Sequence, residues 1–252
     1  MTLVDANRAW FPMRGDTGDE PAVLFCLPHA GGAASVFRSW AGRLPGLDVA
    51  PVQLPGRETR IREAPYTVME HLAADLAAVI RSAAAGRGFA LYGHSLGALA
   101  AFEVTRELRR LGAPQPTHLI VSGSPSPAAS RPPRVIISEL STPELVNVLR
   151  EMGGTPEWLL AEPEFQAMFL PAVRADFGLR ERYEYRQEDP LDVPITVIAS
   201  DDDPRARHPL QTLWATETTA GFQLHTLRGG HFAVFEQPGV TLPHLAHAAR
   251  RR

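Results

Sequence analysis

The stretch FALYGHSLGALA (residues 89–100) decides the fold, because it joins a strand to a helix through a turn that carries a serine. FALY is a short apolar run typical of a buried strand. The following LGALAAFEVTRELRRLG (residues 96–112) has helical spacing of its apolar residues and ends in a glycine. Between them lies GHSLG (residues 93–97), whose glycines allow close packing around a strained serine. We therefore expect the hydroxyl of Ser95 to project from the carboxyl edge of a sheet.

Apolar runs on both sides of this stretch predict a mainly parallel sheet flanked by helices. The expected strands are residues 23–28, 49–54, 89–92, 119–124, 195–200 and 223–227. Helical patterns lie between them, at residues 36–43, 67–83, 96–112 and 209–217, and a last helix runs to the C-terminal arginines. A length of 252 residues suits one large α/β domain. We therefore expect a single α/β domain over residues 1–252.

The alternation of strands and helices stops at residues 125–194, a stretch longer than one crossover needs. Two amphipathic helices are expected there, in STPELVNVLREMG (residues 141–153) and PEFQAMFLPAVRADF (residues 163–177). We interpret the stretch as an inserted helical lid rather than a second domain. Its large apolar residues would either line a chamber between lid and sheet or form the core of the lid: Met152, Trp158, Phe165, Met168, Phe169 and Phe177.

The composition excludes several classes of protein. Hydrophobic residues make up 44% of the chain and charged residues 21%, which argues against disorder and coiled coil. A net charge of −3 gives no support for nucleic-acid binding. No apolar run approaches the roughly 18 residues of a membrane span, and the N-terminal segment lacks the apolar centre of a signal peptide. With Cys26 as its single cysteine, the chain is expected to be a soluble cytoplasmic protein, and we expect a monomer.

A serine hydroxyl becomes a good nucleophile only when a base takes its proton. His231 is the predicted base, because the Gly-Gly loop that carries it follows the last expected strand. His29 and His94 adjoin glycines near the candidate nucleophile, and we interpret both as packing residues. A surface role is expected for the histidines of the late helices and strand, His208, His225, His244 and His247.

The acid that orients the histidine is expected in the loop after the strand at residues 195–200. Three consecutive carboxylates occur there, Asp201, Asp202 and Asp203. The order serine, aspartate, histidine matches that of the α/β-hydrolase fold. We favour Asp203, with Asp202 second, and only one of the three carboxylates can face His231.

Acyl chemistry also needs backbone amides that hold the oxyanion of the tetrahedral intermediate. The amide that follows the nucleophile, that of Leu96, is the first expected donor. The second is expected from the small residues of PHAGG (residues 28–32), with Ala30 favoured. Phosphate-binding glycine motifs and Cys/His spacings typical of a metal site are absent from the sequence, so no cofactor or metal is expected.

Six motifs taken together resemble those of one family. They are LPHAGG (27–32), QLPGRE (53–58), GHSLGA (93–98), LPAVRADF (170–177), DDDPR (201–205) and GGHF (229–232). This set resembles the type II thioesterases, free-standing hydrolases of the α/β-hydrolase superfamily that accompany polyketide synthases and nonribosomal peptide synthetases.

The resemblance implies hydrolysis of stalled or aberrant acyl groups from the phosphopantetheine arm of acyl or peptidyl carrier proteins. Phosphopantetheine would then belong to the substrate. By motif, Ser95 is the nucleophile, Asp203 the orienting acid and His231 the base. Ala30 and Leu96 supply the amides of the oxyanion hole.

Two alternatives stay open. An ester hydrolase or acyltransferase would use the same acyl-serine intermediate, and a catalytically silent module would only bind carrier proteins. Arg57 and Arg174 are candidates for contact with the phosphate or with an acidic carrier surface, although exposed structural ion pairs are the expected role for both.

Overall fold

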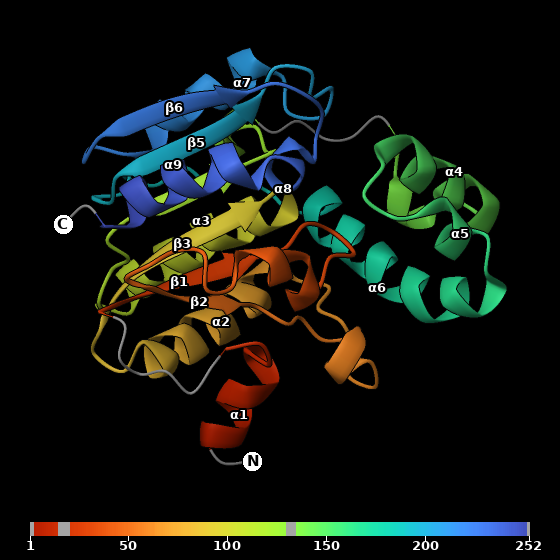
Figure 1. The fold of residues 1–252 in the computed structure, drawn as a ribbon, viewed down its shortest axis with the longest axis horizontal. Coiled ribbons are helices and arrows are strands. Elements are labelled where there is room, and N and C mark those ends of the chain that lie inside the picture. The colour runs from red at the N-terminus through yellow and green to blue at the C-terminus, as the bar shows by residue number, and fades with distance from the viewer. Residues whose placement is uncertain (1–2, 15–20, 130–134, 251–252) are drawn as a thin grey trace.

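The computed structural model describes residues 3–14, 21–129 and 135–250. Its centre is a six-stranded sheet in the order β2-β1-β3-β4-β5-β6 (Figure 1). Every neighbouring pair of strands is parallel, which confirms the predicted sheet. The strands are β1 (Ala22–Leu27), β2 (Leu47–Pro51), β3 (Gly88–His94), β4 (Leu119–Ser122), β5 (Ile195–Ser200) and β6 (Phe222–Leu227).

Helices cover both faces of the sheet. The helices α1 (Leu3–Trp10), α2 (Met69–Ala84) and α3 (Leu96–Arg110) lie on one face, together with the short α7 (His208–Thr212) and η5 (Leu213–Glu217). The other face packs against η1 (Ala34–Trp40), α8 (Ala233–Glu236) and α9 (Pro238–Arg250). Because both faces are covered, the inner strands β1, β3, β4 and β5 are buried along nearly their whole length, whereas the edge strand β6 is only partly buried.

The strand order places the motif loops together at one edge of the sheet. From β1 the chain passes to β2 on one side, and β3 then pairs with β1 on the other side. The order therefore reverses between β1 and β3, where Leu27 pairs with Gly93. Such a reversal leaves a crevice beyond the carboxyl ends of the two strands. PHAGG follows β1 and GHSLG ends β3, so both loops open into this crevice.

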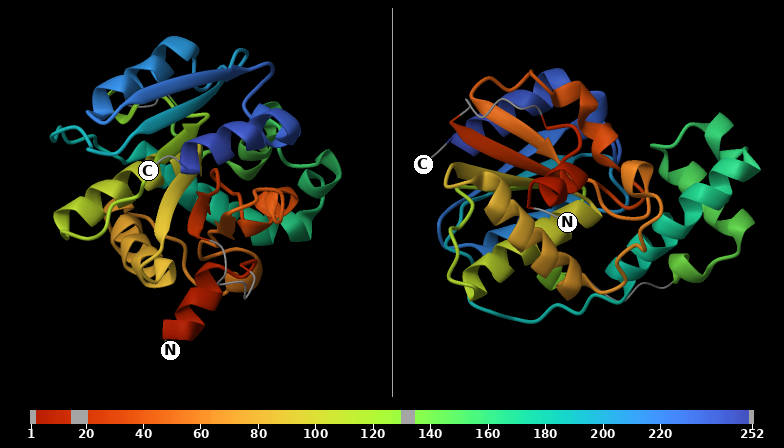
Figure 2. Two further views of the ribbon diagram at one scale, coloured as in Figure 1. Left: turned by 60° about the vertical axis from the view of Figure 1, so that its left-hand side comes forward. Right: turned by 90° about the horizontal axis from the view of Figure 1, so that it is seen from below.

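The stretch between β4 and β5 holds three α-helices, which we refer to as the lid helices. They are α4 (Thr142–Met152), α5 (Glu157–Leu160) and α6 (Pro163–Glu181), and the short turns η3 (Pro127–Ala129) and η4 (Ile137–Glu139) precede them. Figure 2 shows these helices projecting from one side of the body, with α6 lying nearest to it. A separate apolar cluster of the lid helices includes Leu145, Leu149, Leu160 and Leu170.

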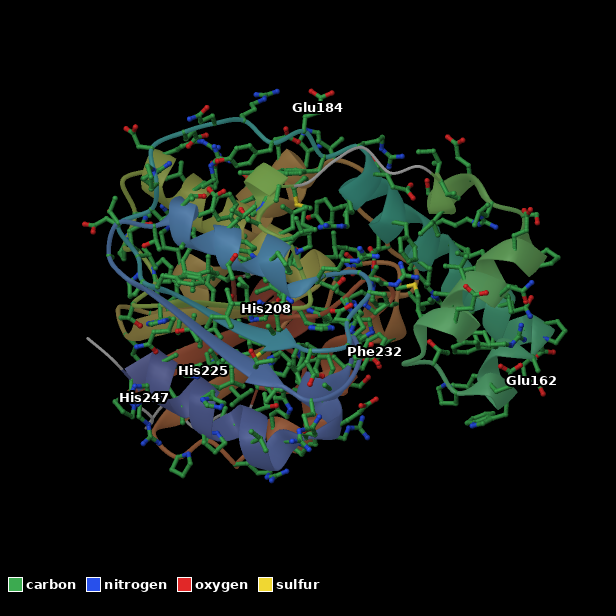
Figure 3. All side chains as sticks on the ribbon, turned by 90° about the horizontal axis from the view of Figure 1, so that it is seen from above. Glu162, Glu184, His208, His225, Phe232 and His247 are labelled. Atoms are coloured by element: carbon green, nitrogen blue, oxygen red, sulfur yellow. The ribbon has the colours of Figure 1, made fainter. Side chains whose placement is uncertain are left out.

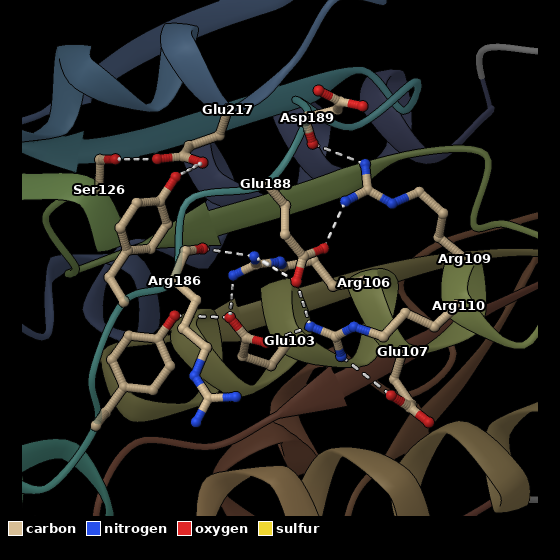
Figure 4. Close-up of polar contacts among 12 residues, drawn as sticks. Glu103, Arg106, Glu107, Arg109, Arg110, Ser126, Arg186, Glu188, Asp189 and Glu217 are labelled. Carbon is tan, nitrogen blue, oxygen red and sulfur yellow. Dashed lines mark hydrogen bonds and ion pairs between the residues drawn. The ribbon is translucent and has the colours of Figure 1, made fainter.

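The segment after α6 returns to the body across α3. There, Glu188 forms ion pairs with Arg106, Arg109 and Arg110 at 2.6–2.8 Å (Figure 4). Arg106 also pairs with Glu103 at 2.9 Å. This cluster lies on the outside of α3 and fixes the path of the chain back to β5.

Several predicted boundaries differ from the structure. The second strand ends at Pro51 rather than residue 54, and the short helix expected at residues 36–43 is a 3-10 helix, η1, at residues 34–40. Leu3–Trp10 form α1, a helix that is not among those expected from the sequence. Trp10 and Phe11 end this segment and are buried, so they anchor it to the core.

Candidate active site

Ser95 occupies a strained turn between β3 and α3. Its backbone has φ 56° and ψ −113°, a region that residues other than glycine rarely adopt. A Cβ on Gly93 would lie 2.1 Å from the carbonyl oxygen of Gly97, and one on Gly97 would lie 2.2 Å from that of Leu27. The amide of Ser95 also donates to the carbonyl of Ser122 at 2.8 Å. Only glycines fit on either side of the serine, and strain held by such packing is a feature of functional sites.

His231 and Asp203 form a buried hydrogen bond. The Nδ1 atom of His231 lies 2.8 Å from Oδ2 of Asp203. The other carboxylate oxygen, Oδ1, accepts from the amides of Arg205 and Ala206 at 2.9 and 3.2 Å. Burial alone would raise the pKa of Asp203, but the hydrogen bonds from His231 and the two amides hold the pKa below its ordinary value. The carboxylate therefore stays ionised and faces the imidazole.

The second ring nitrogen of His231, Nε2, is the atom that a general base would use. Ser95 and His231 line the same chamber. Nε2 of His231 is buried and has no hydrogen-bond partner among the residues that the structure describes. An imidazole held at Nδ1 by a carboxylate keeps Nε2 available as a proton acceptor.

Asp201 and Asp202 have other positions. Both side chains are exposed, unlike that of Asp203. Oδ1 of Asp201 accepts from the amide of Gly229 at 2.8 Å, and this bond ties the loop after β5 to the loop after β6. Of the three consecutive carboxylates, the structure brings only that of Asp203 to His231.

The expected oxyanion donors lie at the same edge of the sheet. Ala30 and Leu96 both line the chamber with Ser95. Within the described part of the chain, neither amide donates a hydrogen bond. The next amide, that of Gly31, is not free to hold an oxyanion, because it donates to Oδ2 of Asp176 at 2.7 Å. Gly31 has φ +75°, and a Cβ there would lie 2.9 Å from the side chain of Val173 on α6.

Asp176 joins the PHAGG loop to QLPGRE. Its two oxygens accept from the guanidinium of Arg57 at 2.6 and 2.9 Å, and both side chains are buried. Arg57 also donates to the carbonyl of Gly32 at 3.0 Å. The expectation of an exposed ion pair at Arg57 was therefore wrong, because the pair is bidentate and buried beneath α6. Arg174 forms no ion pair in the described structure and instead donates to the carbonyls of Ser138 and Leu140.

Two other histidines, His29 and His94, pack near His231. His94 is fully buried, with Nδ1 2.8 Å from the hydroxyl of Ser122 and its ring 4.8 Å from that of His231. Burial lowers the pKa of His94, and it lowers the pKa of His29 to about 3, so both rings stay neutral. Figure 3 shows His225 and His247 at the end of the body away from the lid helices, whereas Phe232 lies at the edge that faces them.

The chamber in front of Ser95 is apolar and has a volume of about 350 Å³. This volume is near the lower end of the range for small-molecule sites, about 300–1,000 Å³. Five of the six large residues predicted for the lid line it, and Phe165 and Phe169 are stacked with their ring centroids 4.9 Å apart. Trp158 does not line it and is 68% exposed. Phe177 and Met152 also pack with the core of the lid, so both interpretations hold in part.

Asp176 was missed by sequence reasoning. Its motif was recognised, but nothing in the spacing showed that α6 would place a carboxylate against a glycine of the loop after β1. The sequence offered no signal for this contact, because the burial of Arg57, which requires an acidic partner, is seen only in the structure.

No helix among the described residues is long and apolar enough to cross a membrane. No group of three or more histidine, cysteine or acidic side chains lies close enough together to bind a metal ion in the same part of the chain. Cys26 is buried in β1, and burial raises the pKa of its thiol.

Comparison with known proteins gives a consistent family. Residues 22–249 match the family model described as a thioesterase domain. The chain is 36% identical to the type II thioesterase BorB from the borrelidin biosynthetic cluster, with a TM-score of 0.87 and coverage of 96% of this chain and 98% of BorB. It is 38% identical to RedJ, a thioesterase of the prodiginine pathway of Streptomyces coelicolor, with a TM-score of 0.85 and coverage of 96% and 99%.

One relative carries a different name. The protein called linear gramicidin dehydrogenase LgrE, from Brevibacillus parabrevis, is 37% identical over 241 residues, which cover 92% of this chain and 88% of that protein. The family match nevertheless spans nearly the whole chain and includes every loop that forms the site. The six-stranded parallel sheet and the strained serine turn agree with it. The chain belongs to the thioesterase family.

Proposed function

We propose that this protein hydrolyses acyl thioesters carried on the phosphopantetheine arm of acyl or peptidyl carrier proteins. It would remove stalled or aberrant acyl groups from polyketide synthases or nonribosomal peptide synthetases. The names of BorB and RedJ, which place those proteins in biosynthetic pathways, support this assignment.

The proposed reaction proceeds in two steps. Nε2 of His231 takes the proton of the Ser95 hydroxyl as Oγ attacks the thioester carbonyl, and the amides of Ala30 and Leu96 hold the oxyanion. The intermediate collapses to an acyl-serine, and His231 returns the proton to the departing pantetheine thiol. His231 then activates a water molecule, which releases the acyl group as a carboxylic acid.

The hydrogen bond of 2.8 Å between His231 and Asp203 carries this proposal. It holds the imidazole at Nδ1 and leaves Nε2 without a partner among the described residues, and His231 lines the same chamber as Ser95. The ionised Asp203 stabilises the imidazolium that forms when Ser95 loses its proton. No cofactor takes part in the proposed reaction, because the arm is part of the substrate.

The test measures the loss of acyl groups from acylated carrier domains by mass spectrometry of the intact domains. A nitrophenyl ester and an N-acetylcysteamine thioester run beside them. We expect rapid deacylation of carriers by the wild type and a loss of about 10⁴-fold or more in Ser95→Ala. Ser39→Ala, on the exposed side of η1, is the matched control and should keep full activity.

The same measurement decides between the alternatives. Rapid cleavage of the ester with no deacylation of the carriers would indicate a general esterase. Transfer of the acyl group to an added thiol or alcohol would indicate an acyltransferase. Carrier binding without turnover would indicate a silent module. Reductive release, which the name of LgrE raises, would consume a reduced nicotinamide and give an aldehyde or alcohol instead of an acid.

The proposed partners are carrier domains alone, with no nucleic acid or membrane. We propose that the protein acts as a monomer in the cytoplasm, where its single cysteine would stay reduced. Size-exclusion chromatography with light scattering tests the monomer, and cell fractionation tests the location.

A further inference from the structure

A second cavity, with a volume of about 840 Å³, also opens at Ser95. It shares Met152, Phe177 and Arg180 with the apolar chamber. The end of α6 and the segment that follows it form much of its wall, and Arg205 contributes from the loop after Asp203. The serine therefore lies between an apolar chamber and a cavity lined by charged side chains.

Arg180 lines this cavity, and its positive charge has no acidic partner in the described structure. Its side chain is half-buried and forms no hydrogen bond or ion pair within the described structure. The adjacent acid, Glu181, is committed elsewhere, since it accepts from the amide of Ile137 at 2.6 Å and from the hydroxyl of Ser138 at 2.5 Å. Burial lowers the pKa of the Arg180 guanidinium, as expected of a desolvated cation without an acidic partner.

Arg205 supplies a second guanidinium at the rim. Its amide donates to Oδ1 of Asp203, so the residue has a fixed place beside the proposed triad. Its side chain is exposed and has no ion pair with any described residue. Glu184 is the other acid that lines the cavity, and Figure 3 shows it at the outer edge of the body with its carboxylate directed away from the ribbon.

The other basic side chains nearby already have partners. Arg57 pairs with Asp176. Arg174 donates to two carbonyls, and Arg182 donates to the carbonyl of Thr67 at 3.4 Å. Arg180 and Arg205 differ from all three because neither guanidinium forms a hydrogen bond or ion pair with a described residue, although the carboxylates of Asp203 and Glu151 attract that of Arg205.

We propose that Arg180, with Arg205 at the rim, binds an anionic oxygen group of the substrate while the thioester carbonyl lies at Ser95. This inference rests on the proposed function. A guanidinium presents paired donors that match a carboxylate or a phosphate. That group is either a carboxylate on the acyl unit or the phosphodiester of the pantetheine arm.

Four thioesters separate the two sources. Butyryl and succinyl groups have the same number of carbons, and succinyl adds a terminal carboxylate. Each is attached either to N-acetylcysteamine, which lacks phosphate, or to phosphopantetheine. We compare kcat/KM of the wild type with that of Arg180→Met, Arg180→Lys and Arg205→Met. Arg150→Met is the control, since Arg150 pairs with Glu157 on the exposed side of the lid helices.

Arg180→Met should lower kcat/KM by about 10- to 100-fold for the substrates that carry the recognised anion. Butyryl-N-acetylcysteamine should change by less than about twofold. Arg180→Lys should recover part of the loss, and Arg205→Met should lose only about two- to fivefold because its side chain is exposed. The melting temperature of Arg180→Met should not fall, since the variant removes a desolvated charge.

Each outcome has one meaning. A loss confined to succinyl substrates identifies the acyl carboxylate, and a loss confined to phosphopantetheine substrates identifies the arm. Equal losses on all four thioesters, or none on any, would overturn the subsite. A wild type that hydrolyses no thioester at all would instead overturn the proposed function, and the subsite with it.

Discussion

The edge of the sheet and the lid helices both line the chamber, but they hold their side chains by different means. At the sheet edge, backbone bonds set the positions. The amide of Ser95 donates to Ser122, and the amide of Asp202 donates to Gly229 at 3.1 Å. The lid helices contact this edge through side chains of α6, chiefly through Asp176 and the packing of Val173 on Gly31.

This difference separates two kinds of residue. Backbone bonds at the ends of parallel strands leave few alternative positions, so a change at the sheet edge removes a reacting group. Side-chain contacts of a helix can adjust, so a change in the lid alters the shape of the chamber. We expect substitutions at the sheet edge to reduce turnover of every substrate and substitutions in the lid to change the choice of substrate.

Asp203→Asn should have the largest effect among the residues that support Ser95. The amide would favour the wrong tautomer of His231, and kcat should fall by roughly 10³- to 10⁴-fold. Asp201→Asn and Asp202→Asn are the controls and should stay within a few-fold of the wild type, because both side chains are exposed. A larger loss at either control than at Asp203 would disprove the assignment of the acid.

Asp176 lies where the two regions meet, so its substitution tests the comparison most directly. Asp176→Asn leaves the buried Arg57 without a charged partner and should lower the free energy of unfolding by about 3 kcal/mol. We expect kcat to fall by about tenfold as well, because the anion that holds the Gly31 amide is lost.

A double variant separates these two effects. In Arg57→Met with Asp176→Leu, apolar side chains replace the whole pair, which should restore stability. Activity should stay low if the pair positions the oxyanion loop. Recovery of both stability and kcat would show that the pair only supports the fold.

Phe169→Ala should change selectivity rather than chemistry. The ring lines the chamber and lies close to Gly31, so its loss should lengthen the space for an acyl chain. The ratio of kcat/KM for long over short acyl thioesters should rise by about tenfold. Trp158→Ala, on the exposed side of the lid, should leave the ratio unchanged. A uniform fall across chain lengths would place Phe169 with the sheet-edge residues instead.

Glu188→Gln should have the smallest effect of these substitutions. We expect it to lower stability slightly and to leave activity unchanged. Burial alone would raise the pKa of Glu188, but hydrogen bonds from Arg110, Arg106 and Arg109 lower it from 4.5 to about 2. The ionised group therefore stabilises the fold above about pH 4.5, and this contribution is lost as the pH falls toward 2. At neutral pH the variant should melt about 2–4 °C lower, and the difference should disappear over that acid range. A fall in kcat/KM would extend the site to this cluster.

Prediction from sequence succeeded where a pattern is local. Short apolar runs predicted the inner strands, because burial on both faces of a parallel sheet leaves a continuous apolar signal, and the partly buried edge strand β6 was also expected, at residues 223–227. The turn at Ser95 was recognisable because two glycines at fixed spacing are needed for close backbone approach. Prediction from sequence failed at element boundaries, as for η1 and the end of β2. Local preferences are weak there, and packing against neighbouring elements decides where an element ends.

The sequence by itself determined the parallel sheet, the strained serine turn and the residues that would follow each strand. Only the tertiary structure decided which carboxylate faces His231, because consecutive residues in a loop point in different directions. It also decided that Asp176 bonds to Gly31 and that Arg180 has no partner in the described structure. Those contacts join segments far apart in the chain, and their geometry depends on how α6 packs against the sheet edge, which no local pattern encodes.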